Sequence, residues 1–188
     1  MDIKNILSIF SGILFAFGYV PYIRSIVRGE TKPSKASWII WAVLDVIVLA
    51  GMMAEHSVNY QIAIAVIGSS LVTILSLKYG ASGWTRLDKC CFAGAILGII
   101  LWLIFNNPIF GIITSLGVMS IGSIPTFVSA WGDASREDKS AWTIFWISCI
   151  FALMAVPAWT VANAAQPITF FATQTIMMYI LYIKSPAR

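Results

Sequence analysis

Residues 18–49, GYVPYIRSIVRGETKPSKASWIIWAVLDVIVL, decide the fold, because their least common positions recur later in the chain. A shift of 104 positions, without a gap, places Pro21 on Pro125 and Trp38 on Trp142. The same register pairs further residues on both sides of this stretch: Ile9 with Ile113, Ser11 with Ser115, Gly18 with Gly122, Ser25 with Ser129, Lys35 with Lys139, Leu49 with Leu153 and Asn59 with Asn163. Pro, Trp and Asn are uncommon inside apolar helices, so these coincidences predict an internal duplication that governs the architecture.

The composition is typical of a membrane protein. The 188 residues are 59% hydrophobic and 11% charged, with a mean hydropathy of +0.86, whereas a soluble domain carries about 25% charged residues. Inside a bilayer the backbone must satisfy its own hydrogen bonds, so spans are helices or a closed barrel. The apolar runs are unbroken rather than alternating, which excludes a barrel and predicts an all-α membrane protein.

Seven apolar segments approach the length of about 20 residues that a spanning helix needs. They are Ile6–Val27, Ser37–Met53, Tyr60–Tyr79, Cys90–Phe105, Ile109–Trp131, Ala141–Ala158 and Ile168–Ile183. The duplication maps the first three segments onto the last three and leaves the fourth without a partner. We therefore predict two parallel three-helix bundles joined by a linker helix (3+1+3), with a first repeat at 1–80, the linker at 81–107 and a second repeat at 108–188.

Basic residues gather on one side of these predicted helices. With seven crossings, the loops 28–36, 80–89 and 132–140 and the C-terminus share that side, and 11 of the 12 Lys and Arg residues lie in these regions or at the adjoining helix ends. Because basic loops stay in the cytoplasm during insertion, we expect a multi-pass protein with the N-terminus outside and the C-terminus cytoplasmic. The net charge of +4 is spread over several loops rather than gathered in a patch, so we expect no nucleic-acid partner.

The helix plan and two short motifs resemble the SWEET sugar facilitators and the wider PQ-loop (MtN3-like) superfamily. The motifs are residues 18–21 (GYVP) and 122–125 (GSIP), followed by loops that end in 36–38 (ASW) and 140–142 (SAW). The sequence departs from the family in lacking the Gln after each Pro. The resemblance implies alternating-access movement of a small polar solute, such as a sugar, across the bilayer.

Each predicted first helix carries a Gly and a Pro one turn apart on the cytoplasmic side, Gly18 with Pro21 and Gly122 with Pro125. Proline removes a helix hydrogen bond and kinks the chain. We interpret these four residues as hinges of an inner gate, following the precedent of transporters built from parallel repeats. The alternative is a static kink that fits helix packing, because Gly and Pro are common in membrane helices.

Asp45 is the acid that lies well inside a predicted span, and the duplication matches it with Cys149. An ionisable group at that depth costs at least about 2.5 kcal/mol and marks a polar path by default. We predict that Asp45 and Trp41, on one helix face, bind the solute or that Asp45 carries a coupled proton; the alternative is an Asp that joins two helices. Trp38, Trp41, Trp142 and Trp146 gather at the cytoplasmic ends of their helices, and we interpret them first as an interfacial aromatic belt. The second interpretation is that one or two of them, such as Trp41, face the cavity and stack on a solute ring.

Matched polar positions in the third helix of each repeat complete the predicted solute site. They are Ser69, Ser70 and Thr73 in the first repeat and Thr169, Thr173 and Gln174 in the second. The shift of 104 pairs Ser69 with Thr173 and Ser70 with Gln174. These groups suit a cavity lined with hydrogen-bonding atoms, but small polar residues also join membrane helices to one another.

Three function classes follow. We favour a facilitator of a small polar solute; a proton-coupled PQ-loop transporter of an amino acid or vitamin-like solute, and a seven-helix sorting or partner-binding receptor, remain as alternatives. The chain has one His, three Cys without a CxxC pair and no Ser–His arrangement, so we expect no enzyme, cofactor or metal site. The partners we expect are a small-molecule solute, the lipid bilayer and, as an option, further copies of the chain. We interpret the charged run 133–139 as a solvated loop.

Overall fold

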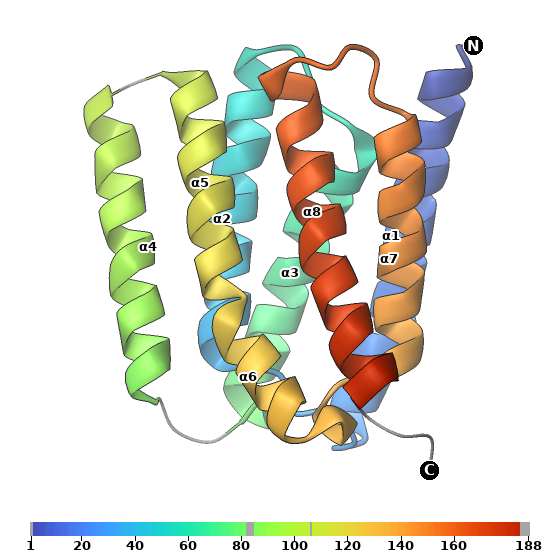
Figure 1. Ribbon diagram of the computed structural model, residues 1–188, viewed down its shortest axis with the longest axis vertical. Coiled ribbons are helices and arrows are strands. Elements are labelled where there is room, and N and C mark those ends of the chain that lie inside the picture. Colours follow the sequence, from blue (N-terminus) through green and yellow to red (C-terminus); the bar gives the residue numbers. More distant parts are fainter. Residues whose placement is uncertain (1, 82–84, 106, 185–188) are drawn as a thin grey trace.

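The computed structural model describes residues 2–81, 85–105 and 107–184 as one bundle of helices, with no strand within these ranges (Figure 1). Arg188 and the positions between these ranges lie outside the described residues. One end of the bundle carries the start of α1, and the other carries the loops after α1, α3 and α6 (Figure 1). We call these the N-terminal end and the basic end.

Eight α-helices and two short helical turns make up the described chain. They are α1 (Ile3–Val27), α2 (Lys35–Ala54), α3 (Tyr60–Tyr79), α4 (Arg86–Phe105), α5 (Pro108–Gly122), α6 (Ile124–Gly132), the 3-10 turn η1 (Ala134–Arg136), α7 (Lys139–Met154), α8 (Val161–Tyr179) and the π-helical turn η2 (Ile180–Lys184). Within the described ranges, four segments are long and apolar enough to cross a membrane: α1, α2, α3, and α5 together with α6 (Pro108–Gly132). The prediction of an all-helical chain is confirmed, and these helices indicate a membrane protein.

Three of the predicted segments differ from the observed helices in particular. The segment 109–131 is interrupted at Ser123 into α5 and α6, because Pro125 has no N–H to continue the helical bonding. The last helix starts at Val161 rather than Ile168, with Pro167 inside it. Its predecessor ends at Met154 rather than Ala158.

Side-chain caps explain where the helices start. The N-caps Ser34, Asn59, Asn107, Asp138 and Thr160 each accept a hydrogen bond from a backbone N–H in the first turn of α2, α3, α5, α7 and α8. Such a cap contributes about 1 kcal/mol. Ser34 and Asp138 occupy matched positions of the duplication, whereas Thr160 lies one turn before Asn163, the match of Asn59.

The helices pack in a ring in which three helices of the first half are followed by three helices of the second half. In the first half α3 contacts both α1 and α2, and in the second half α8 contacts both α7 and α5. Across the halves, α1 packs on α7 and α2 packs on α5, and α4 lies at the edge of the bundle beside α5 (Figure 1). The cavity described below lies among the inward faces of α1, α2, α3, α5, α7 and α8.

Two matched glycines allow the closest approach between the halves. A Cβ on Gly18 in α1 would lie 2.5 Å from the Phe145 ring in α7, and one on Gly122 in α5 would lie 2.6 Å from Ile40 Cγ2 in α2. Real Cβ atoms essentially never approach other atoms so closely, so the two interfaces need glycine at these positions. Gly18 and Gly122 therefore have a role in helix packing, in addition to the hinge role that the sequence predicts.

Loops from the two halves meet at the basic end. The loop after α1 turns at Gly29, whose φ of 75° is in the left-handed region that glycine adopts readily. The backbone N–H of Lys32 then donates to the carbonyl of Arg136 over 3.0 Å. The two bonded residues are matched by the shift of 104 positions, so equivalent points of the two halves touch here.

Candidate solute cavity

A small cavity lies at mid-depth between the two halves of the chain. Its volume is about 50 Å³, which is room for a few water molecules because one water needs about 10–15 Å³ by the same measure. The lining residues are Phe15, Tyr19, Trp38, Trp41, Asp45, Ala65, Ser69, Met119, Trp142, Phe145, Phe170, Thr173 and Gln174. Four pairs among them are matched by the duplication: Phe15 with Met119, Trp38 with Trp142, Trp41 with Phe145 and Ser69 with Thr173.

Unpartnered polar atoms face this cavity. Asp45 is 3% exposed and Ser69 is 2% exposed, yet Asp45 Oδ1 and Ser69 Oγ have no hydrogen-bond partner, although the two groups lie close enough to interact. Gln174 Oε1 and Trp38 Nε1 are buried without a partner as well. Buried polar groups in folded proteins are nearly always bonded, so four such atoms around one hollow indicate a place for a polar ligand or water.

Aromatic rings form most of the cavity wall. The Trp38 and Trp41 ring centroids lie 4.9 Å apart at 77°, and those of Trp41 and Trp142 lie 6.3 Å apart. Trp41 Nε1 donates to Ser123 Oγ over 3.2 Å, which holds the indole against the junction of α5 and α6. All three indoles are buried, so their assignment to an interfacial belt is wrong; Trp146 is the member of that set outside the cavity.

The structure brings five of the eight predicted solute-binding residues together around the cavity: Trp41, Asp45, Ser69, Thr173 and Gln174. Ser70, Thr73 and Thr169 are not among its lining residues. The Ser70 hydroxyl donates to the Val66 carbonyl over 2.7 Å, and Thr73 Oγ1 lies 2.7 Å from the Trp38 carbonyl. The Ser70 and Thr73 hydroxyls therefore satisfy helix backbone, and the Thr73 bond joins α3 to α2.

A buried polar network separates the cavity from the N-terminal end. Ser11 and Ser148 each donate to the other's carbonyl, over 2.9 and 2.8 Å, and so join α1 to α7. Gln61 Nε2 donates to Ser148 Oγ over 3.0 Å, and Gln166 Nε2 donates to Gln61 Oε1 over 3.1 Å. Asn59 Nδ2 completes the chain by donating to Gln166 Oε1 over 2.7 Å. The network ties α1, α3, α7 and α8 together on the N-terminal side of the cavity.

A single acid closes the opposite side of the cavity. Glu137, between η1 and α7, is 5% exposed. Its Oε2 accepts hydrogen bonds from the Tyr22 hydroxyl of α1 over 2.8 Å and from Trp142 Nε1 over 2.9 Å. Because Tyr22 and Glu137 belong to different halves of the chain, this contact joins the halves directly below the aromatic wall. We call these three residues the basic-end latch.

Burial dominates the titration of the latch carboxyl. Removal from water raises the pKa of Glu137 from 4.5 to about 7, since burial disfavours the charged form. The hydrogen bonds from Trp142 and Tyr22 oppose this rise, and the nearby Asp138 adds to it. The latch therefore gains or loses a charge close to neutral pH.

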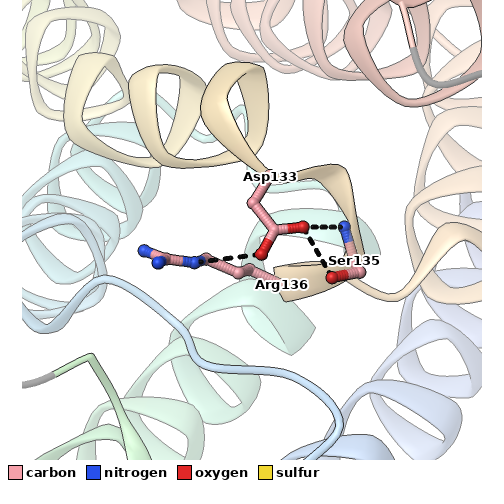
Figure 2. A network of polar contacts seen from close by, with 3 residues as sticks. All are labelled: Asp133, Ser135 and Arg136. Atoms are coloured by element: carbon pink, nitrogen blue, oxygen red, sulfur yellow. Dashed lines mark hydrogen bonds and ion pairs between the residues drawn. The ribbon is translucent and has the colours of Figure 1, made fainter.

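Asp133 and Arg136 belong to the same loop as Glu137 but are exposed to solvent rather than buried. Asp133 and Arg136 are about half exposed and form an ion pair of 3.5 Å between Asp133 Oδ2 and Arg136 Nε, while Asp133 Oδ1 accepts bonds from the hydroxyl and backbone N–H of Ser135 (Figure 2). The Ser135 bonds, with a smaller contribution from Arg136, hold the pKa of Asp133 below its usual value. The interpretation of 133–139 as a solvated loop fits Asp133 and Arg136 and is wrong for Glu137.

The predicted hinge residues occupy unlike local structures. Pro21 lies inside the unbroken α1, whereas Pro125 lies in the first turn of α6, directly after the interruption at Ser123. Ser123 Oγ donates to the Met119 carbonyl over 2.9 Å, which already accepts the backbone N–H of Ser123. The duplication therefore has one continuous and one interrupted copy of the same Gly–Pro helix.

Several residues of this arrangement lie outside the sequence-based site prediction. Tyr22 follows Pro21 and Glu137 lies in a charged loop, so neither pattern indicates burial. Gln61 and Gln166 carry a clearer signal, because glutamine is costly inside an apolar helix unless it is bonded. Searches against protein-family models, curated proteins and solved structures return no match, so function must be argued from the residues and geometry of this chain.

Proposed function

We propose that this chain is an alternating-access transporter of a small polar solute, built on the SWEET-like 3+1+3 plan. In this proposal α1–α3 form one bundle, α5–α8 form the second, and α4 is the linker. The solute binds in the cavity between the bundles. The basic end faces the cytoplasm, following the distribution of Lys and Arg.

The observation that carries the proposal is the placement of the cavity with respect to the duplication. Four matched residue pairs line it, and the matched Lys32 and Arg136 touch at the basic end. A two-fold axis between the bundles accounts for both facts. The same axis exchanges the α1–α7 and α2–α5 interfaces, and parallel transporter repeats bind their solutes at such an interface.

Closure on both sides supports alternating access in particular. The Ser11–Ser148–Gln61–Gln166–Asn59 network lies between the cavity and the N-terminal end, and the basic-end latch lies on its other side. A cavity of about 50 Å³ is too small for a sugar or amino acid, so the cavity must widen before such a solute binds. Solute entry then requires one of the two closures to open.

Proton coupling is the second candidate, and Asp45 is the observation that favours it. A buried carboxyl with an unpartnered oxygen can bind a proton during part of a transport cycle. Cys149 stands at the matched position of the other bundle, so the acid belongs to one copy. Transport, rather than catalysis or peptide reception, is the activity that a cavity between the two halves supports best.

Uptake into liposomes tests the proposal. The purified full chain is reconstituted, and the entry of labelled glucose, amino acids and small amines is measured beside liposomes without protein. We expect saturable uptake of at least one solute, reduced about tenfold or more in Trp41→Ala, which opens the cavity wall. Trp159→Ala, at an indole that is 70% exposed, is the matched control. Uptake equal to that of empty liposomes for every solute would contradict transport.

A further inference from the structure

The cavity contains an acid without a basic counterpart. Asp45 lies near the middle of α2, and none of the described residues that line the cavity is Lys, Arg or His. The other titratable lining group is the Tyr19 phenol, which adds no positive charge. A buried carboxylate is strongly unfavourable unless a positive partner or several donors compensate it, and Asp45 Oδ1 has neither.

The walls around this acid suit a positive charge. Seven of the thirteen lining residues are aromatic, and the faces of their rings carry partial negative charge that attracts cations. Trp38, Trp41 and Trp142 line the same cavity as Asp45, from α2 and α7. Aromatic boxes of this kind recognise ammonium groups.

Three of the four unpartnered atoms favour the same class of solute. Gln174 Oε1 and Asp45 Oδ1 can only accept hydrogen bonds when the carboxyl is ionised, and Ser69 Oγ can accept as well. A solute bearing N–H donors would satisfy them. A sugar, by contrast, presents hydroxyls around its whole ring, and the mainly apolar wall would leave many of them unbonded.

We propose that the solute is a small organic cation whose ammonium group pairs with Asp45 in the cavity that Trp38, Trp41 and Trp142 also line. This inference rests on the proposed transport function and specifies its substrate class. The cavity volume of about 50 Å³ matches a charged head group, and the rest of the solute is accommodated when the cavity widens.

Binding to the purified full chain in lipid nanodiscs tests the inference, with intrinsic tryptophan fluorescence as the readout. The cationic probes are choline and propylammonium, and their uncharged counterparts are 3,3-dimethylbutan-1-ol and propan-1-ol, with glucose as a further neutral probe. We expect at least one cation to bind about tenfold or more tightly than its neutral counterpart, since both the carboxylate and the ring faces distinguish charge.

Variants locate the effect at Asp45. Asp45→Asn should lower the affinity for that cation about tenfold or more, and Asp45→Glu, which keeps the charge, should retain the preference for the cation. Asp133→Asn, at the exposed ion pair of Figure 2, should bind as the unaltered protein does. Asp45→Glu is informative even if Asp45→Asn fails to fold.

The outcomes separate this inference from the proposed function. If neither cation binds, or neutral probes bind as tightly, or Asp45→Asn binds the cation unchanged, the inference is overturned. Liposomes that take up glucose but no cation would overturn it while supporting transport. Charge-selective binding that depends on Asp45, without movement of any solute into liposomes, would support the cation site and contradict transport.

Discussion

The two halves of the chain share a frame but differ at their basic ends. Pro33 in the first half corresponds to Glu137 in the second, and Tyr22 corresponds to Thr126. As a result Trp142 Nε1 donates to Glu137 over 2.9 Å, whereas Trp38 Nε1 lies near the Tyr22 hydroxyl without bonding to it. The latch residues Tyr22 and Glu137 therefore have no counterpart at the positions matched by the predicted duplication.

The same asymmetry appears at the level of the cavity. Asp45 belongs to the first half, where the second has Cys149, and both side chains are buried. The two buried acids of the arrangement, Asp45 and Glu137, therefore come from different copies and lie at different depths. If the chain is the transporter proposed above, solute binding and closure of the basic end depend on residues that differ between the two halves.

The largest expected effect is the loss of the latch acid. Glu137→Ala leaves the Tyr22 hydroxyl and Trp142 Nε1 buried without an acceptor, and each orphaned group costs about 1–3 kcal/mol. We expect the free energy of unfolding in nanodiscs at mildly acidic pH to fall by about 2–5 kcal/mol. Pro33→Ala, at the matched position of the other half, should change it by about 1 kcal/mol or less. Equal losses in both variants would show that the halves are closed alike.

The latch should also make stability depend on pH. The pKa of Glu137 is raised from 4.5 to about 7, so between these values the folded protein holds a proton that the unfolded chain releases. The contribution of Glu137 is therefore fully present below about pH 4.5 and is lost as the pH rises through about 7. Its size is at most about 3 kcal/mol.

Thermal unfolding across this pH range measures the effect. The melting temperature of the unaltered protein should decline with rising pH, and that of Glu137→Gln, which does not titrate, should decline less. A steeper decline in the variant would contradict the assignment of this dependence to Glu137.

Alanine substitutions at Gly18 and Gly122 test the packing contacts between the two halves. Gly18→Ala and Gly122→Ala place a methyl group against Phe145 and Ile40, and overpacking of this kind costs about 1–3 kcal/mol. Gly117→Ala adds a methyl group with nothing within 4 Å and should be neutral or slightly stabilising. If all three variants behaved alike in thermal unfolding, the two glycine contacts would not hold the halves together.

The smallest expected effect is a difference in stability between variants at the two matched tryptophans, Trp38 and Trp142. Trp142→Phe removes the indole donor from Glu137 and should cost about 1 kcal/mol more than Trp38→Phe, because Trp38 Nε1 has no bond to lose. The difference between their thermal unfolding midpoints measures this quantity directly. A larger loss for Trp38→Phe would reverse the comparison.

The sequence predicts most of the helix positions because apolar length and the duplication both constrain them. The interruption at Ser123 and the inclusion of Pro167 in α8 depend on local packing, which a span-length criterion ignores. For the site, matched polar positions and an intramembrane acid direct attention to Trp41, Asp45, Ser69, Thr173 and Gln174, all of which line the cavity.

Other features are fixed by tertiary contacts and leave little trace in the pattern. Glu137 lies in a run of charges, and its burial depends on how η1 turns the loop beneath Trp142 and against Tyr22. The orientation of the indoles is equally hidden, since a tryptophan near a helix end can face lipid or the interior. Helix periodicity alone does not distinguish these two environments.

Access to the cavity from each side tests the central claim most directly. Ser69→Cys and Thr173→Cys, a matched pair in the cavity wall, are made in a chain whose Cys90, Cys91 and Cys149 are replaced by Ala or Ser. Sealed vesicles of either orientation are then exposed to a membrane-impermeant trimethylammonium methanethiosulfonate. If the cavity opens alternately at the two ends, both cysteines react from both sides of the membrane. Reaction from neither side, or from one side alone, would contradict a cavity that opens alternately at the two ends.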